Sequence, residues 1–549
     1  MASRWFERAS LGALLIVPAL MSPAPLQPLI PRAASQELEP QSAAGDLDPS
    51  FGNGGKVTTD FSSNNDVATC VAIQSDGKIV VGGTSTDLTG NSDFALARYN
   101  SDGSLDANFG SGGKVTTDFF HDNDSLNAIA IQPDGKIVAA GSASRPGQGP
   151  QFGVARYNPD GSLDLSFGSA GKTTTNFPGQ DIAYAIAIAP GGKFIVVGTS
   201  SVKPASEFAL ARYNPDASLD TTFGVNGKVV NSIRGLVDDA RSAVLQADGK
   251  VIIAGTHNQG DGFALFRYNT DGTPDNSFGA SGAVTTAVSL SSGATALALQ
   301  PDGKIVAAGS SESGVIKTFF AIARYNADGS LDSTFNEGDL RGFVQTSITS
   351  ANDAATAIAL QNDGKILAAG VAGDPGEFGT GSSDFAIARY KQTGVLDPSF
   401  GTKGKVVTDF FGHNDSARGI ALQPDGKIIL AGVAQAKNNV FALARYLVEN
   451  FTLAFNQPVI NGARGTTVPV GLLINREGGF TDSVTITPPD SSAIGIKLKP
   501  AGPLDTTRST IKVKVKIMSS APLGPHLIIF TANDDQGRVR TAGLTINIE

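Results

Sequence analysis

The chain contains little cysteine, tryptophan and histidine for its 549 residues. Cys70 is the only cysteine, which excludes internal disulfide bonds, so packing alone must stabilise the folded protein. The only tryptophan is Trp5, so the chain beyond the N-terminal segment lacks the side chain that stacks best on sugars. The four histidines show no metal-ligand spacing such as HxxxH, and neither GxSxG nor a Walker loop occurs. The sequence therefore carries none of these common enzyme signatures.

Charged residues are also scarce, at 17% of the chain. The net charge is −9 and no contiguous basic block occurs, which argues against nucleic acid or an anionic membrane surface as a partner. The 65 glycines are typical of many turns and strands rather than long amphipathic helices. At this length we expect several domains or a repeat array rather than one core.

Long apolar runs are missing except near the N-terminus. Arg4 and Arg8 precede the apolar stretch Leu11–Met21, and small residues follow it. This order predicts a signal peptide over residues 1–35 and a linker over residues 36–46. An uncleaved membrane anchor is the alternative, although this apolar stretch is short for a membrane span. We expect a secreted or cell-envelope protein whose mature chain does not insert into a membrane.

The chain is rich in one feature, a repeated phrase. The turn glycine of a "DGK" motif recurs at spacings of 54 to 62 residues, at Gly77, Gly135, Gly192, Gly249, Gly303, Gly364 and Gly426. Each repeat contains four strand-like runs, such as "AIAIQ" (Ala128–Gln132), "KIVAAG" (Lys136–Gly141), "FALARY" (Phe94–Tyr99) and "GKVTTDF" (Gly113–Phe119). Short loops between consecutive strands indicate antiparallel meanders. Seven four-stranded meanders predict an all-β protein with a seven-bladed β-propeller over residues 47–446.

The phase of the repeats predicts a closed ring. The first element after the linker is a fourth strand, Gly55–Phe61, with no partner strands before it. The last repeat supplies only three strands and ends at Phe441–Tyr446. If the N-terminal strand completes the seventh blade, neither end of the array leaves an open sheet edge.

The repeated phrases "LDxxFGxxGKV", "AIAIQPDGKIVAAG" and "FALARYNPDGSLD" resemble the delta-60 repeat family of bacterial secreted proteins. This resemblance covers residues 47–446 and implies export and a β-propeller, but it brings no general activity with it. The fifth repeat departs from the pattern, because "FNEGDLRGFVQT" replaces the usual "FGxxGKVxT" at its fourth strand.

Residues 447–549 carry no copy of the repeat. Alternating runs such as "SVTIT" and "TIKVKVKI" are separated there by glycine, proline and aspartate turns, which predicts a small Ig-like β-sandwich. The segment resembles the cysteine-free Ig-like modules of exported bacterial proteins. We expect it to act as a spacer or solubilising partner rather than as a specific binding module.

Residues present in every repeat are best explained by architecture. The turn "YNSDGSLD" (Tyr99–Asp106) has spaced oxygen side chains, but Arg98 stands where a calcium loop needs its first carboxylate. We therefore interpret its Asn and Asp residues as turn formers that can pair with the repeat arginines. Cys70 belongs to a column of small residues near the axis and is not expected to be a catalytic thiol.

Variation between repeats marks the predicted working face. Loop lengths vary only between the second and third strands and between the fourth and first strands, and these loops emerge on the same face of a propeller. The segments Val371–Ser383 and Ser311–Lys317 are predicted rim elements on this face. A column near the channel mouth is polar and different in each repeat: Thr69, Asn127, Tyr184, Arg241, Thr295, Thr356 and Arg418. Three residues upstream stands a nearly constant acidic column, which we interpret as loop caps.

These patterns favour a secreted, non-enzymatic interaction protein whose partner is an extracellular protein or polymer. The predicted ligand-binding residues at the channel mouth are Tyr184, Arg241, Arg418, Asn127, Asp124, Asp238 and Asp415. We expect no catalytic residue, no metal and no cofactor. Two alternatives stay open: a propeller lyase or hydrolase that uses the same mouth, and a purely structural component of a surface array.

Overall fold

The computed structural model describes most of the chain from Ala44 onward. The predicted signal peptide (residues 1–35) and most of the predicted linker (36–46) lie outside the described residues. The described ranges are 44–61, 64–202, 205–232, 238–257, 262–289, 291–313, 317–336, 341–373, 382–448, 450–477, 483–534 and 539–549.

Within these ranges the repeats form seven four-stranded antiparallel sheets, the blades of the predicted propeller. Blade one consists of β2 (Asp66–Ile73), β3 (Ile79–Thr86), β4 (Ser92–Tyr99) and β5 (Lys114–Thr117). Blade two consists of β6 (Asp124–Ile131), β7 (Ile137–Ala143), β8 (Gln151–Tyr157) and β9 (Lys172–Thr175). Blade three consists of β10 (Gln180–Ile188), the short 3-10 helix η1 (Pro190–Gly192), β11 (Phe194–Val202), β12 (Ala205–Tyr213) and β13 (Lys228–Asn231).

The remaining blades follow the same order from the inner to the outer strand. Blade four consists of β14 (Asp238–Leu245), β15 (Val251–His257), β16 (Gly262–Tyr268) and β17 (Ala283–Thr286), and blade five of β18 (Ser291–Leu299), β19 (Ile305–Ser313), β20 (Lys317–Tyr325) and β21 (Phe343–Thr346). Blade six consists of β22 (Asp353–Leu360), β23 (Ile366–Gly373), β24 (Ser383–Tyr390) and β25 (Lys405–Thr408). Blade seven consists of β26 (Asp415–Leu422), β27 (Ile428–Gln435), β28 (Asn439–Tyr446) and β1 (Lys56–Thr59).

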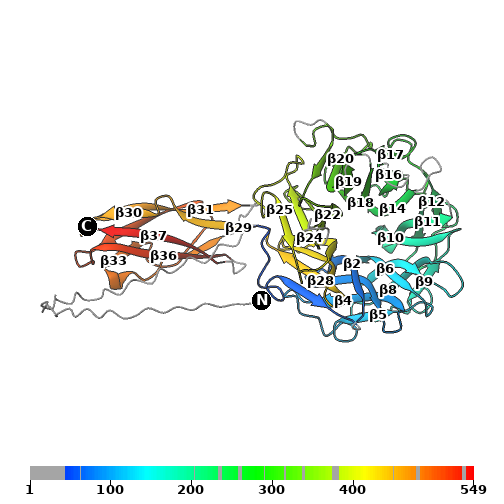
Figure 1. The fold of residues 1–549 in the computed structure, drawn as a ribbon, viewed down its shortest axis with the longest axis horizontal. Helices are drawn as coiled ribbons and strands as arrows, with labels where there is room; N and C mark the ends of the chain where they lie inside the picture. The colour runs from blue at the N-terminus through cyan, green and yellow to red at the C-terminus, as the bar shows by residue number, and fades with distance from the viewer. Residues whose placement is uncertain are drawn as a thin grey trace, which may run out of the picture. The chain divides into compact units, whose positions relative to one another are not determined.

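The first strands of the blades surround a common axis (Figure 1). Each of them contacts the first strand of the next blade, and β26 contacts β2, which closes the ring. Blade seven is completed by the N-terminal segment, because β1 pairs with β28 and Leu47 forms a bridge with Tyr446. The phase of the repeats had predicted this closure. The altered fifth repeat still forms its fourth strand, since β21 pairs with β20.

The hydrophobic core of the propeller lies between neighbouring blades. One cluster, for example, joins Phe94 and Phe109 of repeat one to Leu126 and Ile137 of blade two. The second and third strands are buried along most of their length, because each is covered by a blade on both faces. Every blade therefore depends on its two neighbours for a complete core.

Residues after Val448 form two further sheets around one shared apolar cluster. The strands of the first sheet are β29 (Asn450–Phe455), β31 (Thr467–Glu477), β35 (Thr510–Ile517) and β33 (Ile496–Lys499). Those of the second are β30 (Val459–Gly462), β37 (Val539–Ile548), β36 (Gly524–Asp534), β32 (Val484–Thr487) and β34 (Leu504–Thr506), and the 3-10 helix η3 (Ser492–Ile494) precedes β33. No helix in the described ranges is long and apolar enough to cross a membrane.

Candidate ligand-binding ring at the propeller axis

Every inner strand of the propeller contains a β-bulge at the same position. In β2 the pairing register with β3 shifts between Ala68 and Cys70, so Thr69 is the extra residue. The six other inner strands shift at the equivalent place, and the extra residues are Asn127, Tyr184, Arg241, Thr295, Thr356 and Arg418. A bulge re-aims one side chain out of the regular alternation of a strand. The polar column found in the sequence is therefore a ring of bulge residues, which we call the bulge ring.

The bulge ring lies within the strands rather than on the loops. Thr69 follows the first residue of β2, Asp66, by three positions, which corresponds to about 10 Å at the rise of a strand. The loops between the second and third strands and those between the fourth and first strands share one face of the propeller, which we call the loop face. The two loop types are in contact there, since the backbone N–H of Ser92, at the start of β4, donates to Asn123 in the loop before β6, at 3.1 Å. A partner at this face would approach the bulge ring from the start of the inner strands.

Four bulge-ring side chains bind the backbone of the next blade. The hydroxyl of Thr69 donates to the carbonyl of Leu126 at 2.8 Å, and Asn127 Nδ2 donates to the carbonyl of Ala183 at 2.8 Å. Thr295 and Thr356 make the same contact, each at 2.8 Å, with carbonyls one blade ahead. These side chains hold neighbouring inner strands together. Asn127, one of the predicted binding residues, therefore has a structural partner already.

Tyr184 and Arg241 interact with each other instead. The Arg241 guanidinium lies 4.3 Å from the centroid of the Tyr184 ring, within the range of a cation–π contact. Its Nη2 is 3.6 Å from a carboxylate oxygen of Asp239, which is not among the predicted binding residues. The Arg241 side chain is 41% exposed, so its positive group remains accessible to solvent beside the Tyr184 ring.

Arg418 is the third bulge-ring residue that departs from the structural pattern. Its side chain is exposed, and among the described residues its guanidinium has no hydrogen-bond or ion-pair partner. Desolvation by the surrounding protein lowers its pKa. Because the guanidinium is exposed and has no partner among the described residues, this position is accessible to a ligand that brings a negative charge.

The acidic column caps the loops that lead into the inner strands. Asp124 accepts the backbone N–H of Phe119 at 2.7 Å and that of Ser144 at 3.0 Å. Asp415 likewise accepts the N–H of Phe410 at 2.7 Å and that of Gln435 at 3.2 Å. Both carboxyls are buried, and burial raises their pKa, that of Asp124 to about 7. Asp238 begins β14, but its side chain lies outside the described part of the chain.

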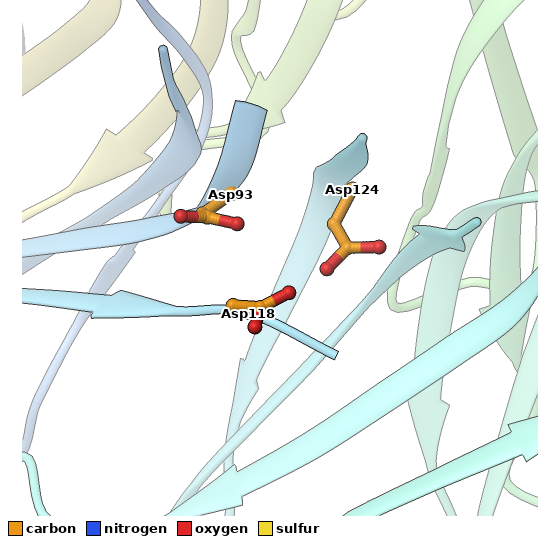
Figure 2. A group of neighbouring side chains, drawn as sticks. All are labelled: Asp93, Asp118 and Asp124. Atoms are coloured by element: carbon orange, nitrogen blue, oxygen red, sulfur yellow. The ribbon is translucent and has the colours of Figure 1, made fainter. Parts of the chain in front are cut away.

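Asp124 also belongs to a group of three carboxylates (Figure 2). Asp93 in β4, Asp118 after β5 and Asp124 in β6 turn their carboxyl groups toward one space, with oxygens within 4.8 Å of one another. Blade six repeats the group with Asp384, Asp409 and Asp415. An all-oxygen donor set is the kind that hard cations such as Ca²⁺ accept. However, both oxygens of Asp124 already accept backbone N–H groups. This loop-capping role is sufficient to explain why the carboxyl is buried. The sequence had not grouped these residues, although the "DFF" phrases at Asp118 and Asp409 mark them.

The constant turns are held by a network that recurs in every blade. Arg156 Nε donates to Asp164 at 2.8 Å, and its Nη1 donates to the carbonyl of Pro215 in the next blade at 2.5 Å. The guanidinium also lies 4.6 Å from the ring centroid of Phe167. Salt bridges and hydrogen bonds hold Asp164 ionised, so its pKa lies below its usual range. The pairing of repeat arginines with turn aspartates is therefore structural, as the sequence indicated.

Two other sequence interpretations can be compared with the structure. Cys70 is partly buried, and desolvation by the surrounding protein raises the pKa of its thiol to about 12, which suppresses the reactive thiolate. Of the predicted rim elements, residues 374–381 and 314–316 lie outside the described ranges. The described ends of the two elements belong to β23 and β24 and to β19 and β20.

The fold and the repeated network define a repeat β-propeller. Seven segments of the chain match the family model described as domain of unknown function (DUF5122) beta-propeller, over residues 74–109, 132–167, 190–223, 246–278, 300–335, 361–400 and 423–448. The seven repeats of the propeller therefore match a β-propeller family model.

Among solved structures, the chain is similar to a glucose dehydrogenase at 13% identity, with a TM-score of 0.32, over 58% of this chain and 96% of the other. It is also similar to domains 4 and 5 of the S-layer protein SbsC at 14% identity, with a TM-score of 0.14, over 22% of this chain and 65% of the other. Likenesses this weak carry no argument about function. No curated protein matches the sequence.

Proposed function

We propose that this protein is an exported, non-enzymatic binding protein that recognises an extracellular protein or polymer at the loop face of its propeller. The observation that carries this proposal is the division of the bulge ring. Four of its seven side chains bind the next blade, whereas Tyr184, Arg241 and Arg418 make no such contact with any residue that the structure describes. The contact between blades requires only residues like the first four, so Tyr184, Arg241 and Arg418 are available for recognition.

The chemistry of the three residues favours an acidic group on the partner. Arg241 and Arg418 supply two cations, and the planar guanidinium forms paired hydrogen bonds with carboxylate or phosphate. The stacked Tyr184 ring orients Arg241 at little entropic cost. We infer that the variable loops select the partner and that the bulge ring binds its acidic group.

The remaining parts of the chain support export and display. Arg4, Arg8 and the apolar stretch Leu11–Met21 favour a cleaved signal peptide. We further propose that the C-terminal domain is Ig-like, which the parallel pairing of β30 with β37 and the packing of two sheets on one core support. We also propose that the repeats are of the delta-60 type, because the repeated phrases that form the blades are the ones that resemble that family.

The experiment compares the parent protein with a variant in which Tyr184, Arg241 and Arg418 are replaced by alanine. Both are used to capture material from the extracellular fraction of the source culture, and captured material is identified by mass spectrometry. Arg241 and Arg418 are exposed and Tyr184 is half-buried. We expect the variant to fold, because exposed positions usually change stability by about 0.5 kcal/mol or less, and to lose the partner that the parent captures.

A matched control carries alanine at Leu165, Lys391 and Lys403, which are exposed at the constant turns. This control should capture the partner like the parent. Equal capture by the bulge-ring variant, or loss of capture in the control, would refute the proposed site. Turnover of a hydrolase or lyase substrate by the parent, abolished in the bulge-ring variant, would establish the enzymatic alternative.

A further inference from the structure

The C-terminal domain carries five exposed lysines on one face of one sheet. In β35 every second residue is a lysine, and these residues are exposed while their neighbours are buried in the core. The edge strand β33 alternates in the same way. The lysines are Lys497, Lys499, Lys512, Lys514 and Lys516, which we call the lysine face.

The register of the sheet places these positive charges directly opposite one another. Lys497 pairs with Lys516, and Lys499 pairs with Lys514. Like charges at opposed positions of antiparallel strands destabilise a sheet. On the other side of β35, the partners of its lysines in β31 are Thr467, Pro469 and Gly471, none of which carries a charge. Folding alone therefore does not explain this arrangement.

Within the described residues no ion pair compensates the lysine face. Among the residues that the structure describes, no salt bridge involves any of these five lysines. A hollow of about 720 Å³ lies beside them, lined by Lys497, Lys499, Lys514 and Lys516 together with the loop Pro488–Ser492. In the described part of the chain, Asp490 is the one carboxylate that lines this hollow, so the lysine face is a concentrated positive surface on a protein whose net charge is −9.

We propose that the lysine face binds an acidic polysaccharide, a chain that carries carboxylates at regular intervals. Lysines recur along β35 about every 7 Å, the distance between alternate residues of a strand, so a linear polyanion can contact several of them at once. The hollow lined by the loop Pro488–Ser492 fits a narrow chain better than a planar bilayer surface.

Single-stranded nucleic acid is recognised by aromatic side chains that stack on bases, and the described residues of this face include none. Recognition here depends on charge and needs no tryptophan platform.

The test measures binding of the full-length protein to polygalacturonate, a carboxylated glycan, by isothermal titration calorimetry. In the variant K514E/K516E each new carboxylate faces a lysine of β33, so the sheet is expected to keep its stability while the surface loses most of its positive charge. We expect binding to weaken by about tenfold or more, since opposed charges suppress association strongly. Raising the ionic strength should weaken parent binding because these charges are exposed.

Three matched variants complete the test. K514R/K516R should bind like the parent, because charge is retained. K391E/K403E changes the net charge equally at exposed propeller positions and should also bind like the parent. R241A/R418A should leave polygalacturonate binding unchanged, which separates this inference from the site at the propeller axis. If K514E/K516E fails to fold, K497Q/K499Q on the edge strand replaces it.

Polygalacturonate binding that is lost in K514E/K516E and kept in the three controls would establish the inference. It would be overturned by equal binding of K514E/K516E and parent, or by no binding of the parent at low ionic strength. Tighter parent binding to oligothymidylate, or to vesicles of phosphatidylglycerol and phosphatidylcholine, would replace the glycan with nucleic acid or with a membrane surface.

Discussion

At the residue scale, the same residue type is used in opposite ways on the two faces of the propeller. The repeat arginines are buried, paired with aspartate and bound to the next blade, as Arg156 illustrates. Arg418 is exposed and lacks such partners among the described residues. Removing one partner from a buried charge pair leaves a charge uncompensated, so the repeat arginines are fixed by stability. Arg418 has no such stabilising role, and we therefore assign it to recognition.

Asp124 makes stability depend on pH near neutrality. Burial and the nearby Asp118 and Asp93 carboxylates raise its pKa to about 7 in the folded protein, from an ordinary value of 3.8. Between these values the folded state holds a proton that the unfolded state has lost, so stability falls as pH rises from about 4 to about 7. Replacing Asp124 by asparagine removes this penalty.

We therefore expect the melting temperature of D124N, relative to the parent, to increase between pH 5 and pH 8. Thermal unfolding followed by circular dichroism across this range measures it. D76N, at an exposed turn aspartate, serves as the control and should track the parent. A constant difference between D124N and the parent over the whole range would contradict the assignment.

At the element scale, the bulge of each inner strand and a glycine of the next strand form one unit. Opposite the bulge, a Cβ at Gly370 would lie 2.0 Å from the carbonyl oxygen of Ala354, and one at Gly141 would lie 1.9 Å from that of Ser125. The equivalent glycines of the other blades face a backbone carbonyl in the same way. The glycine that ends "KIVAAG" is thus required by close backbone approach and not by a turn.

Replacing Gly370 by alanine should destabilise the propeller by about 1–3 kcal/mol or more, because a backbone carbonyl cannot move aside as a flexible side chain can. Chemical denaturation of the full chain measures this change. Gly149→Ala is the matched control, since a Cβ there meets only Gln180 Cγ at an ordinary 3.5 Å. Equal midpoints for the two variants would mean that the inner strand shifts to accept a side chain, and the bulge would then not depend on glycine.

At the scale of the whole molecule, the N-terminal segment closes the ring through more than one strand. Asp48 receives Arg445 Nε at 2.9 Å and Lys427 Nζ at 3.1 Å, and Phe51 lies under the Arg445 guanidinium at 4.5 Å. Arg445 Nη1 also donates to the carbonyl of Ser101 in the first repeat. The segment therefore reproduces the complete turn network of an ordinary blade at the junction between the two ends of the array.

Deleting residues 47–61 should expose the edge of β28 and remove the partners of Arg445, and we expect strong destabilisation or aggregation. Size-exclusion chromatography and thermal unfolding of the truncated protein measure both effects. A deletion of the same length, residues 535–549, removes β37 from the C-terminal domain instead and should leave the propeller transition in place. Normal melting of the 47–61 truncation would show that the ring does not need its N-terminal strand.

The sequence by itself determined the strands, the number of blades, the closure and the constant turns. The strands and turns follow from local patterns, turn glycines and apolar runs, that recur in seven copies. The closure follows from the offset phase of the first and last copies. The bulge-ring column was also visible, because aligned repeats show which position varies while its neighbours stay constant.

Only the tertiary structure decided which of these residues are structural and which are available. Asn127 and Tyr184 occupy equivalent positions in the sequence, but the contact with a neighbouring blade distinguishes them, and such contacts join residues more than fifty positions apart. The lysine face shows the same limit. The sequence contains no basic block, but alternation and cross-strand register gather five lysines on one face. Charge density is a property of surfaces, and the chain acquires a surface only by folding.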